Sequence, residues 1–262
     1  MQDKRIVLTG AGGGIGSRLA ARLAAAGGRV CAVDLDPDAL QSLQAAFPDR
    51  VHTVTADITR SGDRQRIVSE TLAVFGGIDL LVNAAGINPF GVFAEQDEGL
   101  LEKTVNVNTV APMLLTRAVL PEMLKQGTGQ IVNIGSTFGS IGFAWFAAYS
   151  ASKFALRGFS QALRRELADS GITVSYIAPR AVKTAINSPR VYDMARAVKM
   201  NMDDPDSVAD RILVAIRRRR KECYIGFPES LFVRINAVLP ALVDRALRRQ
   251  NQVARQYATQ SG

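Results

Sequence analysis

Cysteine and histidine are the scarcest reactive residues of this chain. Its 262 residues include two cysteines, Cys31 and Cys223, and a single histidine, His52. One imidazole supplies neither a serine–histidine–aspartate triad nor the ligand set of a zinc site, so the sequence predicts no metal centre and no catalytic histidine. Both cysteines stand inside apolar strand-like segments, which favours buried small side chains over a disulfide.

Long hydrophobic runs are missing as well. The segment 4–8 is already strand-like, which leaves no room before it for the charged, apolar and small-residue parts of an export signal. The apolar tail from Leu231 is interrupted by Arg234, Asn236 and Pro240, well short of the about 20 residues needed to cross a bilayer. We therefore expect a cytoplasmic protein.

The positive charge is concentrated in the last fifth of the chain. The net charge is +8; residues 211–262 hold eleven basic and three acidic residues, a difference of eight, whereas residues 1–210 hold 21 of each. The basic cluster has no interleaved aromatic residues beyond Tyr224 and Tyr257, so we expect no nucleic-acid partner. Hydrophobic residues make up 47% of the chain, which is enough for a large core.

Short apolar segments alternate with segments of helical length. Strands are expected at 5–9, 30–34, 51–55, 80–83, 131–135 and 174–178, and helices at 15–26, 37–46, 62–75, 96–125 and 147–169. Because the strands lack polar alternation, this order predicts one α/β domain, a doubly wound parallel sheet (Rossmann fold) covered on both faces. Asp204 and Pro205 then begin a further helix, a last strand is expected at 223–226, and 228–250 is mainly helical.

A glycine-rich loop joins the first strand to the first helix. It reads Thr9-Gly10-Ala11-Gly12-Gly13-Gly14-Ile15-Gly16. Glycine lets the backbone turn tightly beside a pyrophosphate, whose charge is stabilised by the N–H groups at a helix N-terminus. Such loops also serve as plain turns, but the position of this one favours a dinucleotide site.

Asp34 ends the second strand, 18 residues after Gly16. A carboxylate there can accept both ribose hydroxyls of NAD and repels the additional phosphate of NADP. The loop carries no arginine or lysine to bind that phosphate, so we expect NAD(H) as the cofactor. The alternative role, a helix N-cap, suits Asp36 better than Asp34.

From here the residues resemble the compact, single-domain subgroup of the short-chain dehydrogenase/reductase family. The loop matches that family's TGxxxGxG form, and Tyr149 and Lys153 match its YxxxK element, 13 residues after Ser136. The other matches follow in order along the chain, at Asp57, Asn83-Ala84-Ala85-Gly86 and Asn108. Five ordered motifs over about 180 residues make chance agreement improbable.

The resemblance implies a role for each of these residues. It implies Asn108, Ser136, Tyr149 and Lys153 as the catalytic residues. It implies cofactor contacts at Gly10, Gly14, Ile15, Gly16, Asp34, Asp57, Ile58, Asn83, Ala84, Gly86, Tyr149, Lys153, Pro179, Val182 and Thr184. It also implies a homodimer or a tetramer, and the domain is expected to span 1–226 with a helical C-terminal extension, 227–262, packed on it.

Two positions depart from the family pattern. The family's Pro-Gly-x-x-x-Thr element lies at 179–184, and Arg180 replaces its glycine. We expect this arginine to reshape the floor beside the nicotinamide. The family's common C-terminal strand with its Asp-Gly-Gly ending is missing, which argues against the usual tetramer.

The spacing of Tyr149 and Lys153 suits acid/base chemistry. Four residues apart on a helix, they share one face. A free tyrosine has a pKa of about 10, too high for an efficient base near neutrality, so its phenolate needs a nearby cation such as Lys153. The resemblance implies that Lys153 also holds the nicotinamide ribose. Ser136, at the end of a strand, can hydrogen-bond to the substrate oxygen while hydride moves to or from the cofactor.

Pro112 lies inside the long expected helix. Proline cannot bond to the carbonyl four residues back, which here belongs to Asn108. The resemblance implies that this carbonyl binds a water that relays protons between Lys153 and solvent. A simple break between two helical segments explains the proline equally well.

Apolar side chains flank the expected reaction centre. Beside Ser136 and Tyr149 the sequence offers Phe138, Phe143, Trp145 and Phe146, and after Thr184 it offers Val191, Met194, Val198, Met200 and Met202. Such walls favour a bulky hydrophobic alcohol or ketone, of steroid, retinoid or lipid type. The same residues could instead pack the domain or a subunit contact.

The tail has an amphipathic pattern. One helical face would carry Ile235, Val238, Leu239, Leu242, Ala246 and Leu247, with Arg234, Arg245, Arg248 and Arg249 around it. This face could lie on an anionic membrane, or pack on its own domain or a partner subunit.

Two other classes of protein compete with an active dehydrogenase. A non-catalytic NAD-binding sensor or scaffold would usually have lost Tyr149 or Lys153, and both are present. An epimerase or dehydratase of the related longer fold would need a different glycine spacing and an additional substrate domain, for which 262 residues are too few.

Overall fold

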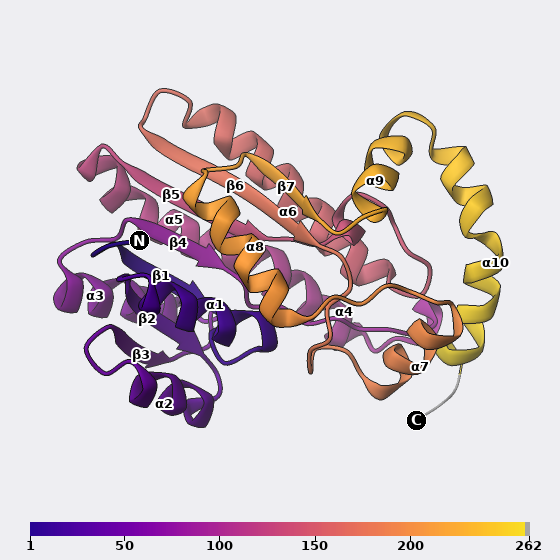
Figure 1. The fold of residues 1–262 in the computed structure, drawn as a ribbon, viewed down its shortest axis with the longest axis horizontal. Helices are drawn as coiled ribbons and strands as arrows, with labels where there is room; N and C mark the ends of the chain where they lie inside the picture. The colour runs from indigo at the N-terminus through magenta and orange to yellow at the C-terminus, as the bar shows by residue number, and fades with distance from the viewer. Residues whose placement is uncertain (260–262) are drawn as a thin grey trace.

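Seven parallel strands form the centre of the molecule. The computed structural model describes residues 1–259, and its strands follow the order β3-β2-β1-β4-β5-β6-β7 (Figure 1). They are β1 (Arg5–Thr9), β2 (Arg29–Asp34), β3 (Val51–Thr55), β4 (Leu80–Asn83), β5 (Gly129–Ile134), β6 (Ile172–Pro179) and β7 (Glu222–Ile225). The predicted doubly wound parallel sheet in a single domain is confirmed.

Helices cover both faces of this sheet. Side chains of α1, α2 and α8 pack on one face and side chains of α3, α5 and α6 on the other. The helices are α1 (Gly14–Ala25), α2 (Pro37–Ala46), α3 (Ser61–Phe75), α4 (Glu98–Val105), α5 (Ala111–Gln126), α6 (Ala147–Glu166), α7 (Pro189–Ala197), α8 (Pro205–Arg217), α9 (Glu229–Val238) and α10 (Pro240–Ala258), with single turns η1 (Phe93–Glu95), η2 (Asn106–Val110) and η3 (Thr137–Gly139).

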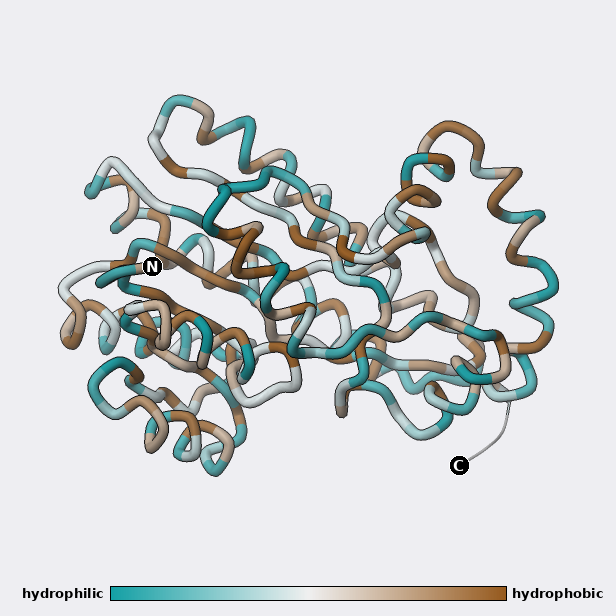
Figure 2. The backbone as a smooth tube through the Cα atoms, viewed as in Figure 1, coloured by the Kyte–Doolittle hydropathy of each residue, from teal (hydrophilic) through white to brown (hydrophobic). Residues whose placement is uncertain are grey.

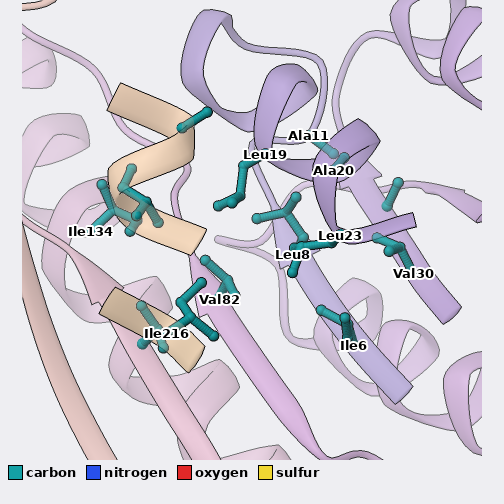
Figure 3. Close-up of a cluster of buried hydrophobic side chains, with 14 of the residues drawn as sticks. Ile6, Leu8, Ala11, Leu19, Ala20, Leu23, Val30, Val82, Ile134 and Ile216 are labelled. Carbon is teal, nitrogen blue, oxygen red and sulfur yellow. The ribbon is translucent and has the colours of Figure 1, made fainter. Parts of the chain in front are cut away.

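The side chains of β1 divide the core into two clusters. Ile6 and Leu8 belong to the cluster under α1 and α8, whereas Val7 belongs to the cluster under α3 and α5. Successive side chains of a strand point to opposite faces, so a strand covered on both faces reads as an unbroken apolar run. Figure 3 shows the first cluster. Each fully buried side chain of this size stabilises the fold by about 1.5–3 kcal/mol.

The strand order reverses beside β1, which pairs with both β2 and β4. Connections leave β1 and β4 toward opposite directions at this point, and a crevice forms outside the carboxyl ends of the strands. The glycine loop after β1 and the segments that follow β4, β5 and β6 all start at this edge. The topology therefore gathers the motifs that the sequence scatters over about 180 residues.

The predicted helical stretch over 96–125 is confirmed from residue 98 onward, but it is divided into three segments. The chain forms η1, then α4, whose first turn is capped by the Asp97 carboxylate accepting from Leu100 N at 2.8 Å. At η2 the backbone widens into one π-helical turn, in which Ala111 N donates to Asn106 O, five residues back. Pro112, which has no N–H, follows directly in the first turn of α5. The path stays helical throughout, so the proline marks a widened turn rather than a break.

The tail is also two helices rather than one. Leu239 leaves the helical region (φ −131°, ψ 62°) and Pro240 opens α10. This turn separates the face predicted over 235–247, so that prediction is wrong. Val238, Leu239 and Leu242 are exposed, and the turn between the helices is coloured as hydrophobic in Figure 2.

The side chains that α9 and α10 bury are Val233, Val243, Ala254 and Ala258. The Trp145 indole N–H donates to the Asn251 carbonyl at 3.2 Å, and Arg190 of α7 donates to the carbonyls of the last helical turn, at 3.0 Å to Tyr257 and to Ala258. Helices α7, α9 and α10 thus lie together beside one end of the sheet (Figure 1). The last three residues of the expected extension, 260–262, lie outside the described residues.

Candidate active site

A cleft of about 110 Å³ opens at the carboxyl edge of the sheet. Its walls come from α1, α6 and the segments that follow β4, β5 and β6. Ten of the residues expected from the sequence line it: Ile15, Ala84, Gly86, Ser136, Phe138, Tyr149, Lys153, Pro179, Val182 and Thr184. The fold therefore brings the serine, tyrosine and lysine to one place together with much of the expected cofactor surface.

The glycine loop is packed against the end of β4. Gly10 has φ +71°, and a Cβ there would lie 2.7 Å from the amide nitrogen of Ala85. At Gly14 a Cβ would meet the Thr184 methyl group, and at Gly16 it would meet the Gly10 carbonyl. The loop can therefore run this close to its neighbours only with glycine at these positions. It leads into the N-terminus of α1, which no side chain caps, so its N–H groups fit a pyrophosphate.

Asp34 faces the glycine loop. Its carboxylate accepts from Gly12 N and from Leu35 N, both at 2.8 Å. The cap of α2 is instead Asp36, which accepts from Asp38 N and Ala39 N. Asp34 thus stands at the tip of β2, half-buried, beside the loop where a dinucleotide would lie.

Tyr149 and Ser136, both expected to be catalytic, line the cleft together. Ser136 follows β5, and its hydroxyl accepts from Phe138 N at 3.1 Å. Tyr149 stands in the first turn of α6. Burial raises the pKa of its phenol to about 12, because a desolvated phenolate is disfavoured, and a hydrogen bond with the Ser136 side chain offsets part of that rise.

Lys153 lies one turn further along α6 and is 5% exposed. Its ammonium donates to the Ile134 carbonyl at 3.1 Å and lies 5.8 Å from the centre of the Tyr149 ring. Burial lowers the pKa of Lys153 to about 8. In this conformation the ammonium is held by a backbone carbonyl and Lys153 is not among the groups that shift the pKa of Tyr149, so its role in stabilising the phenolate stays a prediction.

Asn108 lies behind the cleft wall, fully buried in η2. Its carboxamide accepts from Ile87 N at 2.9 Å and donates to Ile87 O at 2.9 Å and to Ser152 Oγ at 3.0 Å. Gly86 separates it from Lys153: a Cβ there would lie 3.1 Å from Asn108 Oδ1 and 3.5 Å from the Lys153 ammonium. Asn108 therefore positions the loop after β4 and α6, and the proton relay through its backbone carbonyl stays a prediction.

Seven of the expected cofactor residues are not part of the cleft lining: Gly10, Gly14, Gly16 and Asp34, which belong to the glycine loop and its neighbour at the tip of β2, and Asp57, Ile58 and Asn83. Asn83 is buried within the sheet and donates to Asn133 Oδ1 at 2.8 Å. Ile58 packs into the core under α3 and α5. Asp57 follows β3, where hydrogen bonds from the Thr59 hydroxyl and amide hold the pKa of its carboxyl below the usual value.

The expected aromatic wall is divided between two places. Phe138 lines the cleft, with its ring 6.2 Å from that of Tyr149. Phe143 stacks on the far side of Phe138 and lines a separate cavity. Trp145 does not reach the cleft: its indole is held by α10 through Asn251.

Two asparagines in the cleft were missed by the sequence analysis. Asn88 donates to Asn187 Oδ1 at 3.1 Å, and both side chains line the cleft. The Oδ1 of Asn88 is buried without a hydrogen-bond partner within residues 1–259. Asn88 comes two residues after the Asn83–Gly86 motif, and nothing in its immediate sequence distinguishes it from a loop residue. Its carboxamide oxygen is therefore an acceptor without a partner at the edge of the cleft.

Arg180 joins three segments. Its guanidinium donates to Asp203 at 2.7 Å, to Glu229 at 2.8 Å and to the Phe227 carbonyl at 2.9 Å. The hydrogen bond that it donates to the Asp203 carboxylate is the main reason that its pKa is raised. Gly226 (φ +114°) passes so close that a Cβ would lie 2.8 Å from Arg180 Cγ. The arginine that replaces the family's glycine thus ties the end of β6 to α9 and to the start of α8.

Other sequence features lie away from the cleft. Cys31 is buried in β2, and Cys223 is half-buried in β7; both are free thiols. His52 of β3 approaches Glu70 at 3.2 Å. Within residues 1–259 no cluster of three or more His, Cys, Asp or Glu side chains has the geometry of a metal site. Over the same range, no helix combines the length and the apolar character needed to span a membrane.

A doubly wound sheet with a glycine loop and a Ser, Tyr, Lys cluster at its switch point defines a dinucleotide-dependent oxidoreductase. The chain belongs to the short-chain dehydrogenase/reductase family: the family model described as short chain dehydrogenase matches residues 4–195. The chain is 31% identical to the ketoacyl reductase HetN of a Nostoc strain, over 95% of this chain and 89% of that protein.

Solved structures agree with the family assignment. A short-chain dehydrogenase/reductase from Burkholderia phymatum in complex with NAD superposes with a TM-score of 0.83 at 25% identity, covering 92% of this chain and 95% of that one. An actinorhodin polyketide ketoreductase variant with NADPH superposes with a TM-score of 0.78 at 29% identity, covering 86% of this chain and 97% of that one. Members of the family thus carry either form of the nicotinamide cofactor.

Proposed function

We propose that this chain is an NAD(H)-dependent oxidoreductase that interconverts a secondary alcohol and a ketone with an apolar body. The observation that carries the proposal is the convergence of Ser136, Tyr149 and Lys153 on one cleft, next to the glycine loop and Asp34. Family membership supplies the coarser activity, oxidoreduction at a CH–OH or C=O group.

The cofactor fits residues that are already in place. The glycine loop and the N-terminus of α1 suit the pyrophosphate, and the half-buried carboxylate of Asp34 suits a ribose. Ala84, Gly86, Val182 and Thr184 line the part of the cleft beyond the loop. A bound nicotinamide supplies or accepts the hydride.

The proton is handled by the side chains of the cleft. In the reductive direction the Tyr149 phenol donates its proton to the carbonyl oxygen as that oxygen gains charge, and the Ser136 hydroxyl donates a hydrogen bond to the same oxygen. In the oxidative direction the phenolate takes the alcohol proton. Lys153, when its ammonium leaves the Ile134 carbonyl, provides positive charge one helical turn from the phenolate.

The preference for NAD(H) rests on Asp34. A 2′-phosphate placed beside its carboxylate would meet like charge in a half-buried position, whereas a free 2′-hydroxyl can donate to it. The family does not decide this point, because solved neighbours were obtained with NAD, NADH and NADPH.

The preference for an apolar substrate rests on the cleft walls. Phe138, Phe146, Ile186, Val191 and Met200 line the space in front of Tyr149. The polar lining at this end includes the carboxamides of Asn88 and Asn187 and the guanidinium of Arg180, whose charge is already paired with Asp203 and Glu229, so the set suits a neutral polar group rather than a phosphate.

The test is turnover with a panel of alcohols and ketones, followed by NADH absorbance, with Tyr149→Phe as the control. We expect apolar secondary alcohols to exceed small polyols in kcat/KM. A faster reaction with the polyols would contradict the apolar substrate. NAD(H) binding without turnover of any member would favour the alternative of a non-catalytic NAD-binding sensor or scaffold.

A further inference from the structure

A second cavity lies behind the aromatic wall of the cleft. Its volume is about 280 Å³, against about 110 Å³ for the cleft itself. It is bounded by η3, by the segment before α8, and by α9 and α10, the pair of helices beside one end of the sheet in Figure 1. None of the expected cofactor residues lines it.

The two spaces share a wall. Phe138, Arg180, Ala181 and Met200 line both of them. Phe138 presents one side toward Tyr149, with ring centres 6.2 Å apart, and stacks on Phe143 with ring centres 4.9 Å apart and planes 2° from parallel. Only side chains therefore separate the larger cavity from the reacting phenol. The Met200 side chain, with three rotatable bonds, is adaptable enough to open the way.

The lining suits a hydrocarbon chain. The apolar lining comes from η3 and the segment that follows it, from α9 and from α10, and includes Phe138, Ile141, Phe143, Phe232, Val243 and Leu247. The polar members of the lining are Thr137, Arg180, Lys199, Asn201, Glu229 and Gln250, and the Arg180 guanidinium is paired with Glu229. A largely apolar space of this size stabilises alkyl groups by removing them from water, and it offers few partners to a polyol.

We propose that this cavity binds the apolar tail of an extended substrate, an alkyl or acyl chain whose reacting oxygen lies between Ser136 and Tyr149. The inference rests on the proposed function and names the part of the substrate that the cleft cannot hold. The cleft takes the reacting carbon, and Phe138 and Met200 form the passage to the tail.

Arg180 holds the roof of this cavity. Its ion pair with Glu229 fixes the first turn of α9, its ion pair with Asp203 fixes the opposite wall, and it lines the passage itself. Glycine at this position, as in the family pattern, would provide neither ion pair. The arginine that replaces the family's glycine at position 180 is thus part of the wall of the second cavity.

The test compares a cavity-filling variant with a matched exposed one. Val243 is 5% exposed and lines the cavity, whereas its neighbour Leu242 is 54% exposed. Secondary alcohols with four-carbon and ten-carbon chains serve as substrates, with kcat and KM measured separately. We expect the longer chain to be preferred by the unaltered protein, and Val243→Trp to lower its kcat/KM about tenfold or more. Val243→Trp should leave kcat/KM for the four-carbon alcohol unchanged. Leu242→Trp should leave kcat/KM unchanged for both alcohols.

A second variant guards against misfolding of the first. Ala246 lines the cavity but is exposed, so Ala246→Phe narrows the cavity mouth without overpacking the core. We expect the same selective loss for the ten-carbon alcohol, through KM. Equal kcat/KM for both chain lengths in the unaltered protein and both variants would overturn the tail site and leave the proposed function standing.

Binding measured without turnover separates the two proposals. Equilibrium dialysis with the ten-carbon ketone reports occupancy whether or not the chain catalyses hydride transfer. Binding that Ala246→Phe weakens, in a protein without turnover, would support the cavity and refute the enzymatic function. Binding that neither variant changes would refute the cavity.

Discussion

At the scale of single residues, burial opposes charge on both members of the Tyr149–Lys153 pair. The pKa of the phenol is raised to about 12 and the pKa of the ammonium is lowered to about 8. Burial therefore disfavours the phenolate and the ammonium alike, although at neutral pH most of the lysine still carries its proton.

Replacing Lys153 should make the protein more stable and inactive. The pKa of this lysine falls from 10.5 in the unfolded chain to about 8, so the unfolded chain binds more protons between those pH values and stability rises with pH across them. We expect Lys153→Met to raise the free energy of unfolding by about 1–3 kcal/mol at neutral pH, an advantage that vanishes toward pH 10.5.

Urea unfolding at neutral and alkaline pH measures this difference. Lys125→Met, at an exposed lysine of α5, is the control and should leave stability nearly unchanged. A destabilised Lys153→Met protein would show that the hydrogen bond to Ile134 outweighs the cost of burying the ammonium.

The phenol of Tyr149 should set the pH dependence of the reaction. Because its pKa is raised to about 12, the proton stays on the phenol through neutral pH. Ketone reduction should therefore be nearly independent of pH there, whereas alcohol oxidation should accelerate as pH rises. Tyr149→Phe should lose about 100- to 10,000-fold in kcat in both directions.

Initial rates in each direction over a range of pH test this prediction. Tyr224→Phe is the matched control, since that hydroxyl binds Ser140 and Glu222 away from the cleft. Oxidation that slows at alkaline pH in the unaltered protein would contradict the role of the phenolate.

The carboxylate of Asp34 should set the choice of cofactor. Removing its charge in Asp34→Asn removes the repulsion of a 2′-phosphate and weakens the bond to the ribose. We expect the ratio of kcat/KM for NADH over NADPH to fall by about 10- to 100-fold. Asp36→Asn is the control, because that residue only caps α2. An unchanged ratio would place cofactor selection elsewhere.

At the scale of elements, helices and strands were predictable from the sequence where local chemistry and periodicity agree. The helix Pro37–Ala46 was predicted to the residue because Asp36 caps it and Pro37 opens it. The strands Arg5–Thr9, Val51–Thr55 and Leu80–Asn83 were found from their β-branched runs bounded by loops.

The failures have physical reasons. A π-turn changes one hydrogen bond and leaves the apolar spacing of the flanking helices almost unchanged, so η2 has no signature in periodicity. Pro240 stands at a position compatible with either a kink or a new helix, and only the backbone of Leu239 decides between them. The helix α7 was missed although Ser188 and Pro189 form a regular start signal, because its apolar residues were read only as a substrate wall.

The candidate site divides in the same way. Sequence motifs identify Ser136, Tyr149, Lys153 and the glycine loop, and the topology of the sheet brings them together. Trp145 could not be excluded from the cleft beforehand, since its direction depends on a contact with α10 more than 100 residues away. The second cavity is lined by residues from segments far apart in the sequence, three of which Arg180 joins through its ion pairs and its bond to the Phe227 carbonyl.

Arg180→Gly should loosen the C-terminal helices. The variant removes two ion pairs whose side chains are 16–27% exposed. We expect unfolding free energy to fall by about 1–3 kcal/mol and amide exchange to quicken in α9 and α10. Arg196→Ala, which removes an exposed pair with Asp193, should cost less than about 0.5 kcal/mol. Unchanged exchange over 229–258 would show that packing alone holds these helices.

At the scale of the whole molecule, the turn between α9 and α10 forms an exposed apolar surface rimmed with positive charge. The exposed apolar side chains are Phe227, Leu231, Phe232, Val238, Leu239 and Leu242. Exposed arginines surround them on the same two helices, at Arg234, Arg245, Arg248 and Arg249. We propose that this surface contacts an anionic membrane, to which both its charge and its apolar tip are complementary.

Vesicle co-sedimentation tests the membrane contact. We expect binding to vesicles containing phosphatidylserine at low salt, loss of binding at high salt, and weak binding to phosphatidylcholine alone. Replacing Val238, Leu239 and Leu242 by serine should abolish it, whereas Val74→Ser in α3 should not. Binding that survives the triple replacement would contradict the proposal. A lower molecular mass of the triple variant than of the unaltered protein in solution would assign the surface to a second copy of the chain.

The expected homodimer or tetramer stays a prediction, and light scattering of the unaltered protein measures it.

The π-turn at Asn106–Val110 also bears on which changes of chain length the protein tolerates. A turn closed five residues back holds one residue more than a regular turn. Loss of one residue there would let α4 and α5 fuse into an ordinary helix with both ends facing as before. Loss of one residue elsewhere in α5 would rotate everything beyond it by about 100°. Deletion of one residue at this place should therefore move the Asn108 side chain from its present position and leave a protein that folds but is inactive.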